Sequence, residues 1–447
     1  MKSLYNRFIR PLFFSRRLYI ALVAITFMFV LSFWLPVLFD IARIAFWFLV
    51  LLVVLDYVVL FRIRGITVHR ETPERFSNGD PNKVKLVMVN KYSFVVSATI
   101  IDEIPIQFQH RDFKLDIKLK PGEETEAQYI LRPVKRGEYM FHDIHIFTRS
   151  PLQLVLHRIT VDAKQAVKVF PSFITMRKYE IVAYTSNLAE AGTKRVRKLG
   201  SSLEFEQIKE YVRGDDIRTI HWKATARKGS LMVNTYTDER SQQIYCIIDK
   251  GRVMKMPFEG MSLLDYAINA TLILSRVALI KQDKAGVITF SEEPGKILAA
   301  ERKAGQMNAI LEKLYSEDTK FLESDFEKLY ILMRTRITQR SLVILFTNFE
   351  SLSGLERQLT YIRSIATRHL VLVVFFENTE LKELTESKVQ NLEELYIRTI
   401  AEKFAHEKRL IVKELQKHGI LTILTTPQRL TVDTVNKYLE LKARQAI

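Results

Sequence analysis

Two almost unbroken apolar stretches dominate the pattern at the start of the chain. They run from Leu18 to Val37 and from Ile41 to Phe61, and each matches the roughly 20 residues that a helix needs to cross a bilayer. Only Leu38-Phe39-Asp40 beside Pro36 separates them, which predicts a tight hairpin. A cleaved signal peptide is the competing interpretation, but the first stretch is long, lacks a small-x-small cleavage site and is followed at once by another span. Residues 1–64 are therefore interpreted as a basic N-terminus and two membrane helices.

Basic residues at both ends of this hairpin predict its orientation. They precede the first span and follow the second: Lys2, Arg7, Arg10, Arg16 and Arg17 before, and Arg62, Arg64 and Arg70 after. By the positive-inside rule both ends face the cytoplasm. We expect a multi-pass protein of the inner (cytoplasmic) membrane with both termini cytoplasmic.

Two charged residues fall inside the second span. Arg43 is close enough to the outer end to extend its charge to the interface. Asp56 is nearer the cytoplasmic side, where a charge costs less than the roughly 2.5–3.5 kcal/mol of the bilayer centre. We interpret Asp56 as an interfacial charge, and a polar contact to a partner helix is the alternative.

Residues 65–175 change to an alternation of apolar and polar positions with a period of two. Such runs are typical of strands with one buried face, and several short ones separated by turns predict a small antiparallel β-sandwich of immunoglobulin-like type. His142 and His145 are three apart on a predicted strand and point to opposite faces, which argues against a shared metal. The strand runs are Val84–Asn90, Phe113–Leu119 and Tyr139–Phe147, with turn signals at Ser77–Asp80, Pro121–Gly122 and Arg136–Gly137.

Residues 176–242 combine a basic linker, Ser186–Ser202, with a stretch from Gly200 to Arg240 in which charges alternate with single large aromatics. The linker is solvated or touches anionic lipid. In the second stretch, no apolar stripe persists long enough to explain the pattern by burial. Asp215 or Asp216 is expected to cap a short helix from Ile217 to Ala226, with Ile217, Ile220 and Ala224 on its inner face.

This charged stretch has two interpretations. It is a connector whose arginines pair with nearby carboxylates, or it is a recognition or locking surface between two domains. Under the second interpretation the candidate binding residues are Arg213, Gly214, Asp215, Arg218, Trp222, Lys223, Arg227 and Arg240.

Residues 243–447 alternate strand and helix patterns, which predicts an α/β domain with a mostly parallel sheet covered on both faces. One hairpin, at residues 285–300, predicts an antiparallel edge strand. The predicted strands are Gln243–Asp249, Ala285–Phe290, Lys296–Ala300, Ser341–Thr347, Leu370–Phe376 and Ile420–Thr425, and the principal helices are Leu263–Ile280, Gln390–His418 and Thr431–Ala443.

The stretch after residue 200 also resembles a known family. Gly200-x-x-x-Glu204-Phe205, the run from Arg213 to Arg227 that contains Arg-Gly-Asp-x-x-Arg-x-Ile-x-Trp-Lys, and Glu239-Arg240 are similar to the signature of the bacterial "domain of unknown function 58" family. The resemblance implies a membrane-anchored protein associated with a MoxR-type AAA+ ATPase. It also implies a von Willebrand factor A-like fold in the C-terminal half.

That fold directs attention to the carboxyl ends of the central strands, where ligands gather. The adhesion-type metal site there uses Asp-x-Ser-x-Ser, but the first strand of this chain ends Asp249-Lys-Gly-Arg252, which lacks both hydroxyl ligands. Adjacent cations disfavour a metal ion further, so we expect no metal and no cofactor. Asp249, Arg252 and Asn348 remain as candidates for binding a partner at this rim.

Composition excludes some functions and leaves others open. The 447-residue chain is long enough for two or three domains, and its net charge of +17 suits anionic lipid, an acidic protein or nucleic acid. The single cysteine, Cys246, excludes an intramolecular disulfide. No phosphate-binding loop, His-Glu-x-x-His or Gly-x-Ser-x-Gly motif occurs.

We therefore expect a binding protein rather than an enzyme. The leading hypothesis is a membrane-anchored cytoplasmic scaffold that recruits or presents clients to a MoxR-type AAA+ ATPase, with an unknown client and no specific nucleic acid. The alternative is a basic, membrane-tethered module that binds nucleic acid or anionic lipid. A hydrolase built on His221 and Asp215 is the third class, although no nucleophile is evidently paired with them.

Overall fold

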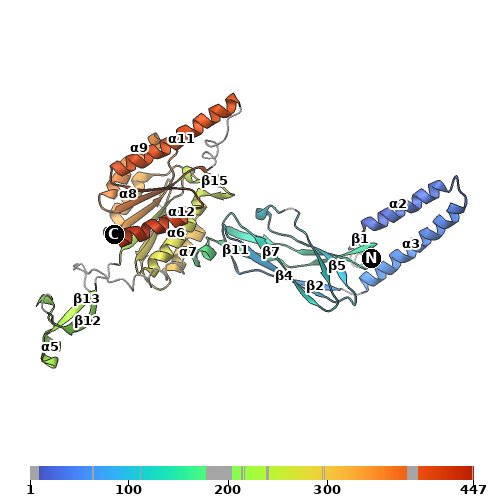
Figure 1. Cartoon of the computed structure of the whole chain (residues 1–447), viewed down its shortest axis with the longest axis horizontal. Helices are drawn as coiled ribbons and strands as arrows, with labels where there is room; N and C mark the ends of the chain where they lie inside the picture. Colours follow the sequence, from blue (N-terminus) through green and yellow to red (C-terminus); the bar gives the residue numbers. More distant parts are fainter. Residues whose placement is uncertain are drawn as a thin grey trace. The chain divides into compact units, whose positions relative to one another are not determined.

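The computed structural model describes residues 10–62, 65–110, 112–177, 204–212, 215, 217–237, 241–293, 295, 297–379, 391–444 and 446. The chain divides into two compact units, Met1–Phe170 and Pro171–Ile447. Both are drawn in Figure 1, and each is described by itself below. The linker predicted at residues 186–202 lies outside the described residues.

The first unit contains an immunoglobulin-like β-sandwich. One sheet has the order β1-β10-β9-β5-β6, and two three-stranded sheets have the orders β2-β4-β7 and β3-β11-β8. Alternate residues of β4 are buried, as the period-two pattern predicts, and Phe76, Leu86, Ile100 and Phe141 are among the fully buried side chains. The strands are β1 Leu12–Phe14, β2 Ile66–Glu71, β3 Arg75–Ser77, β4 Asn82–Asn90, β5 Val96–Asp102, β6 Leu115–Leu119, β7 Glu124–Leu131, β8 Gly137–Phe141, β9 Ile144–Arg149, β10 Val155–Val161 and β11 Gln165–Phe170.

One predicted strand proves to be two. The run Tyr139–Phe147 is divided between β8 and β9, which belong to different sheets, and His142 lies in the connection between them. His145 is on β9 and contacts Glu103 Oε1 through Nε2 at 2.9 Å. The two histidines are therefore separated by a change of sheet rather than by the pleat of one strand.

Two apolar helices are inserted between β1 and β2. α2 covers Arg16–Leu31, and α3 covers Val37–Phe61. The prediction placed the turn too late, because the chain turns at Ser32–Pro36 and α3 already begins at Val37. α2 has 16 residues, fewer than the span predicted, whereas α3 has 25. Pro36 at the N-cap of α3 suits a helix start, since proline has no N–H to contribute.

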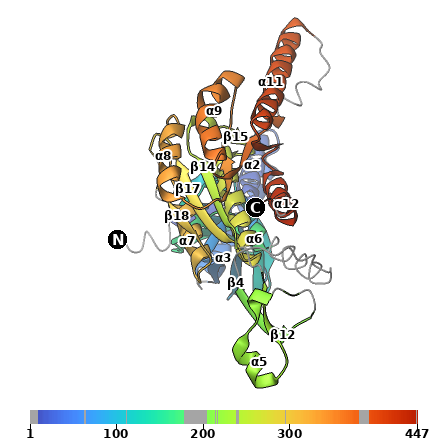
Figure 2. The same cartoon turned by 90° about the vertical axis from the view of Figure 1, so that its left-hand side faces the viewer.

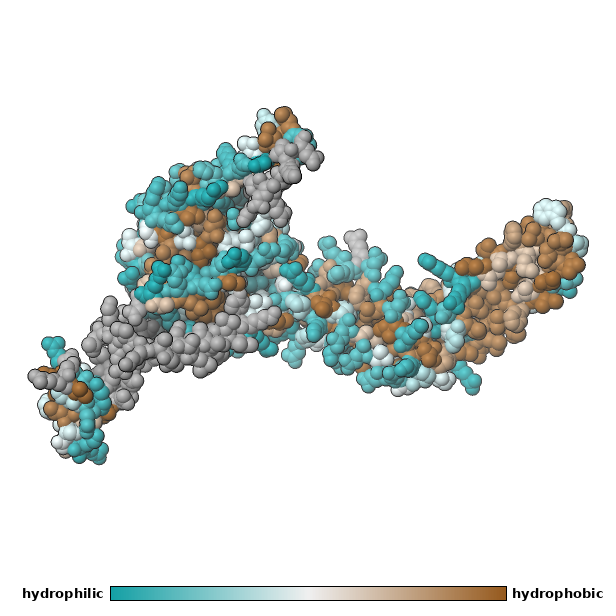
Figure 3. Space-filling view, viewed as in Figure 1, coloured by the Kyte–Doolittle hydropathy of each residue, from teal (hydrophilic) through white to brown (hydrophobic). Residues whose placement is uncertain are grey.

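The surface of this hairpin is apolar. Figure 3 shows hydrophobic side chains covering α2 and α3, where Phe33, Trp34 and Trp47 are among the exposed large residues. Among the described residues, α3 and α6 (Leu263–Ile280) are long and apolar enough to cross a membrane. α6 is mostly buried inside the second unit, which accounts for its composition without a membrane.

Both ends of the hairpin are held by the sandwich. β1 pairs antiparallel with β10, and Ser15 at the start of α2 donates its N–H to the Leu154 carbonyl at 3.1 Å. At the other end, the Tyr92 hydroxyl donates to the Leu60 carbonyl of α3 at 2.9 Å. The sequence-based division at residue 64 did not anticipate that a strand before the first helix joins the sandwich.

Asp56 is not the interfacial charge that the sequence suggested. Its side chain is buried, with the residue 1% exposed, and Oδ2 accepts the backbone N–H groups of Leu154 and Val155, both at 2.9 Å. The partner is therefore the start of β10 and not another helix. Asp56 lies on the same helical face as the buried residues Ala42 and Leu49, at intervals of seven residues.

The second unit contains a six-stranded sheet with the order β18-β17-β14-β19-β20-β21, in which only β18 is antiparallel to its neighbour. α6, α7 and α12 cover one face, and α8, α9 and α11 cover the other (Figure 2). β14, α6 and β20 begin and end as predicted. The bounds are β14 Gln243–Asp249, β17 Lys284–Phe290, β18 Leu298–Glu301, β19 Leu342–Phe346, β20 Leu370–Phe376, β21 Leu421–Thr425, α7 Gln306–Ser316, α8 Phe326–Arg336, α9 Leu352–Ala366, α11 Leu392–Lys417 and α12 Leu430–Ala443.

We predict that Asp56→Ala lowers the free energy of unfolding of the first unit by about 2–4 kcal/mol, because two buried N–H groups lose their acceptor. Asp56→Asn should cost less, since an amide oxygen still accepts. Thermal unfolding of the detergent-solubilised chain measures the difference. Asp40→Asn is the matched control, because Asp40 is exposed and pairs with Arg43 at 3.2 Å. Equal effects of Asp56→Ala and Asp40→Asn would contradict the assigned role.

Candidate functional site

The carboxyl ends of the parallel strands form the first candidate region. In the strand order of this sheet, β14 and β19 are adjacent but are followed by connections to opposite sides, which makes the edge between them the topological switch point. Asp249 ends β14, and Thr347 and Asn348 follow β19. The structure therefore brings Asp249 and Asn348 to one edge, as expected from the sequence.

Asp249 is fully enclosed and saturated with hydrogen bonds. Gly251 N–H donates to Oδ1 at 2.8 Å, the Thr347 hydroxyl donates to Oδ2 at 2.6 Å, and the Ser324 hydroxyl donates to Oδ1. Burial raises the pKa of Asp249, and these three donors partly oppose the rise. A Cβ on Gly251 would lie 2.0 Å from the Ser324 oxygen, so only glycine permits this closure. Asp249 serves to hold three loops together.

Two lysines near Asp249 form ion pairs with a glutamate, whereas the nearby Arg252 side chain is exposed. Lys250 Nζ is paired with Glu317 at 2.8 Å, and Lys313 contacts the same carboxylate. Arg252 lies in a short 3-10 turn, Arg252–Met254, with an exposed side chain. Among the described residues, no group of three His, Cys, Asp or Glu side chains is placed to hold a metal ion. Asp249 is thus buried, whereas the Arg252 side chain at the same rim is exposed.

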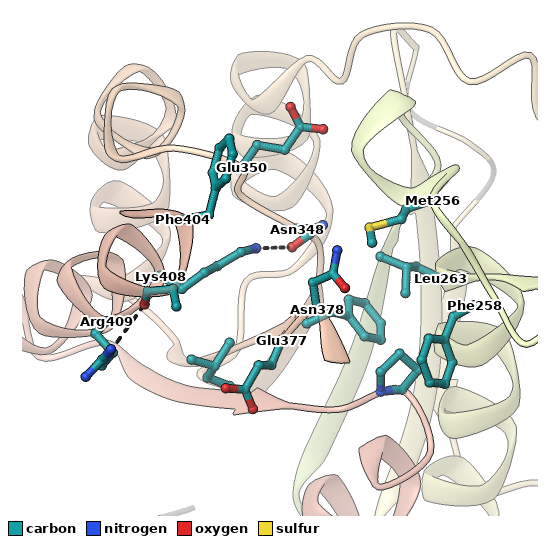
Figure 4. Close-up of a pocket in the computed structure, with 14 residues that line it drawn as sticks. Met256, Phe258, Leu263, Asn348, Glu350, Glu377, Asn378, Phe404, Lys408 and Arg409 are labelled. Carbon is teal, nitrogen blue, oxygen red and sulfur yellow. Dashed lines mark hydrogen bonds between the residues drawn. The ribbon is translucent and has the colours of Figure 1, made fainter. Parts of the chain in front are cut away.

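A cavity of about 580 Å³ lies beside this edge, at the carboxyl ends of β19, β20 and β21 (Figure 4). Its volume is in the range of small-ligand pockets. Apolar side chains form much of the wall, and polar groups converge on one side. The apolar residues include Met256, Phe258, Leu263, Phe376, Phe404, Leu424 and Pro427, and the polar ones are Asn348, Glu350, Glu377, Asn378, Lys408 and Arg409.

Lys408 of α11 is one of the two cations that line this cavity. Nζ donates to Asn348 Oδ1 at 2.6 Å and lies 5.7 Å from the centre of the Phe375 ring. Burial lowers the pKa of Lys408 to about 8, and the charge of Glu350 opposes that fall. Among the described carboxylates, none forms an ion pair with Lys408 within 4.0 Å. Lys408 is thus a desolvated cation with an amide as its hydrogen-bond partner.

Sequence reasoning did not single out Lys408, although a signal was present. Ile411 and Leu415 are buried on α11, and Lys408 precedes them by three and seven residues. A lysine on the inward face of an otherwise amphipathic helix is unusual, because a buried ammonium is costly.

The second candidate region is the small module formed by residues 204–237. β12 (Glu204–Glu210) and β13 (Met232–Thr237) pair antiparallel, and a 3-10 turn (Ile217–Thr219) and α5 (Trp222–Lys228) connect them. The helix predicted from Ile217 to Ala226 is wrong in its start and its cap. α5 begins at Trp222 because His221 Nδ1 accepts the Ala224 N–H at 3.0 Å. Ile217, expected on an inner face, is exposed.

Asp215 stabilises the turn instead of capping the helix. Its carboxylate pairs with Lys209 Nζ at 2.8 Å and accepts the Val212 N–H at 3.0 Å. The Lys209 hydrogen bond and the Val212 N–H lower the pKa of Asp215. These contacts commit both His221 and Asp215, the pair considered for hydrolysis, to local structure.

The outer surface of this module combines an exposed tryptophan with cations. Trp222 is 70% exposed, and Arg218, Lys223 and Arg227 are exposed beside it in the sequence. Val212, Ile217 and Leu231 add exposed apolar area. Three further candidates, Arg213, Gly214 and Arg240, lie outside the described residues.

A known protein family matches the part of the chain that contains both candidate regions. A family described as "Protein of unknown function DUF58" matches residues 207–417, which include most of the module, Asp249 and Lys408. A curated relative, "Uncharacterized protein YeaD" from Bacillus subtilis (strain 168), is 25% identical over 122 residues. The match covers 27% of this chain and 30% of the relative.

Solved structures resemble parts of the chain. The CARDB domain of a Pyrococcus furiosus protein has a TM-score of 0.17 at 17% identity and covers 23% of this chain and 86% of that one. A PapD-like domain of human CEP192 has a TM-score of 0.18 at 9% identity, covering 24% and 87%. Proximal thread matrix protein 1 from the mussel byssus has a TM-score of 0.26 at 13% identity, covering 43% and 45%.

We predict that Lys408→Met raises the melting temperature at about pH 7 by about 2–4 °C, the shift that ~1 kcal/mol produces in a unit of this size. The folded pKa of about 8 is below the unfolded value of 10.5, so the unfolded chain binds the proton more tightly between these values. The cost of Lys408 is full below about pH 8 and fades as the pH rises to 10.5. The gain from Lys408→Met should therefore shrink at high pH.

Scanning fluorimetry at both pH values, with the exposed Lys413→Met on the same helix as control, measures this gain. A destabilised Lys408→Met variant at neutral pH would show that the charge contributes favourably to folding.

Proposed function

We propose that this protein is a membrane-anchored, cytoplasmic binding or scaffold protein that works with a MoxR-type AAA+ ATPase, in the assembly or chaperoning of client or envelope proteins. The observation that carries the proposal is the exposed Trp222 among the cations of the 204–237 module. Tryptophan and arginine are the residues most enriched at the centres of protein interfaces. The resemblance of the signature, and not the family match itself, suggests the class of partner.

Membrane anchoring is supported by the helical hairpin. α3 has the length and apolarity of a membrane span, and the exposed apolar surface continues over α2. Because β1 and β2 belong to the same sandwich unit, both ends of the hairpin must lie on one side of the bilayer. The basic residues at these ends support the cytoplasmic side.

A von Willebrand factor A-like fold for the α/β domain is part of the proposal. The strand order, with the first strand central and one antiparallel edge strand, β18, supports it. In this domain the carboxylate at the switch point is occupied by hydroxyl and backbone donors. Such saturation supports partner binding through other surfaces and argues against chemistry at Asp249.

We predict that Trp222→Ala weakens association with the MoxR-type ATPase by about 10-fold or more, as expected when a central aromatic anchor is removed. Arg218→Ala should weaken it less. Co-purification from detergent, followed by titration of the two purified proteins, measures the loss. Trp34→Ala is the control, because Trp34 is also 70% exposed but lies in the turn of the hairpin. Unchanged ATPase binding by a folded Trp222→Ala variant, or salt-sensitive vesicle binding in its place, would overturn the assignment.

We also predict the orientation of the hairpin. A membrane-impermeant maleimide added to intact cells should label Ser32→Cys in the turn and should not label Glu123→Cys in an exposed sandwich loop. Native Cys246 can remain, because it is buried and burial raises the pKa of its thiol to about 12. After lysis, Glu123→Cys should react. Labelling of Glu123→Cys in intact cells would place the sandwich outside.

A further inference from the structure

The cavity beside β19, β20 and β21 is independent of both the Asp249 cluster and the 204–237 module. Its polar and apolar groups are partly segregated, as Figure 4 shows: Lys408 and Asn348 meet on one side, and Met256, Leu263 and Phe258 face them, whereas Phe404 lies beside Glu350. Segregation of this kind selects a ligand with a polar end and an apolar body.

The polar end of that ligand is an anion. The ammonium of Lys408 has three donors, and Asn348 Oδ1 accepts one of them at 2.6 Å. Lys408 has no ion-pair partner among the described carboxylates, and it is held over an aromatic ring in largely apolar surroundings. An anion would form a strong hydrogen bond with Lys408, because little water competes for the ammonium. This pairing would also offset the free-energy cost of burying the ammonium.

The charge balance disfavours an anion with more than one negative charge. Two cations, Lys408 and Arg409, and two carboxylates, Glu350 and Glu377, line the cavity. A dianionic phosphate would meet no net positive charge, and the carboxylates would repel it. A carboxylate that contacts only Lys408 satisfies the cation with less repulsion.

The body of the ligand has peptide character. Asn378 and Glu377 follow β20 and line the cavity with amide and carboxylate groups, which match the backbone of a peptide and not a plain hydrocarbon chain. An apolar track also leads to the cavity mouth. Leu392, Tyr396 and Ile400 are exposed at four-residue spacing on α11, in line with Phe404 at the cavity. A longer chain would be accommodated along this track.

We propose that this cavity binds the free carboxyl terminus of a polypeptide whose last side chain is apolar. Lys408 binds the terminal carboxylate, and the last side chain packs among Met256, Phe258 and Leu263. Binding of this kind provides a site for a client or partner tail that is separate from the ATPase-binding surface proposed above.

The test uses the full chain in detergent micelles and a fluorescein-labelled hexapeptide, Ala-Gly-Ser-Ala-Leu-Phe, as the free acid and as the C-terminal amide. Fluorescence anisotropy should show the acid binding about 10-fold more tightly than the amide, because only the acid pairs with Lys408. A peptide acid ending in Ser should bind more weakly than the one ending in Phe.

Variants separate the two parts of the site. Lys408→Met should abolish the preference for the acid, whereas the exposed Lys413→Met should leave it unchanged. Phe404→Ala should weaken the acid and the amide alike. Affinity for the acid should fall as the pH rises above the Lys408 titration, with Glu350, Glu377 and Arg409 as the other charged groups facing the cavity.

Several outcomes would overturn the proposal. They are equal affinity for the acid and the amide, no binding at about 1 mM peptide, and an acid preference that survives in Lys408→Met. Displacement of the peptide by dodecanoate at lower concentration than by unlabelled peptide acid would overturn the assignment to a polypeptide. None of these results depends on the ATPase, so the failure of one proposal leaves the other standing.

Discussion

The attachment of both ends of the helical hairpin to one β-sandwich is the constraint on which the rest of the structure depends. β1, which precedes α2, and β2, which follows α3, are both strands of the sandwich. Asp56 adds a fixed contact, because its carboxylate accepts two backbone N–H groups where β10 begins. Such a carboxylate is stable when buried only while those donors remain. A hairpin held in this way crosses a membrane twice or not at all, so the sandwich stays on one side.

Buried charges have two different fates in this protein. Asp56 Oδ2 and both oxygens of Asp249 accept N–H and hydroxyl donors, most of them from segments distant in sequence, and each carboxylate thereby fixes the path of the chain. Lys408 receives an amide oxygen and an aromatic ring, which leaves a cation that folding has desolvated without pairing. The hydrogen bonds of Asp249 close the switch point between β14 and β19. Lys408, whose ammonium has donors left over, lies instead in the cavity at the carboxyl ends of β19, β20 and β21.

The sequence predicted the α/β unit well because its central strands are continuous apolar runs with sharp ends. β14, α6 and β20 match to the residue. The local sequence pattern gave wrong predictions where the structure of a residue depends on a hydrogen-bond partner that the pattern does not identify. Asp56 was assigned from its depth in a bilayer, but its partners are 98 and 99 residues away. The start of α5 was assigned to an aspartate cap, but Asp215 is held by Lys209, and His221 caps the helix. Lys408 was overlooked because its surroundings come from several strands.

The 204–237 module is small, and exposed apolar side chains are therefore unexpected on it. A two-stranded hairpin with one short helix has too little core to be stable through burial alone. Its described contacts are mainly turn and cap interactions, such as Asp215 with Lys209 and His221 with Ala224. A module with so little apolar area to spare nevertheless exposes Trp222, Ile217 and Val212, which neither its fold nor its solubility requires. Under the proposed function, burial of these side chains against a partner would remove that cost, and the cations beside them would favour a partner with an acidic surface.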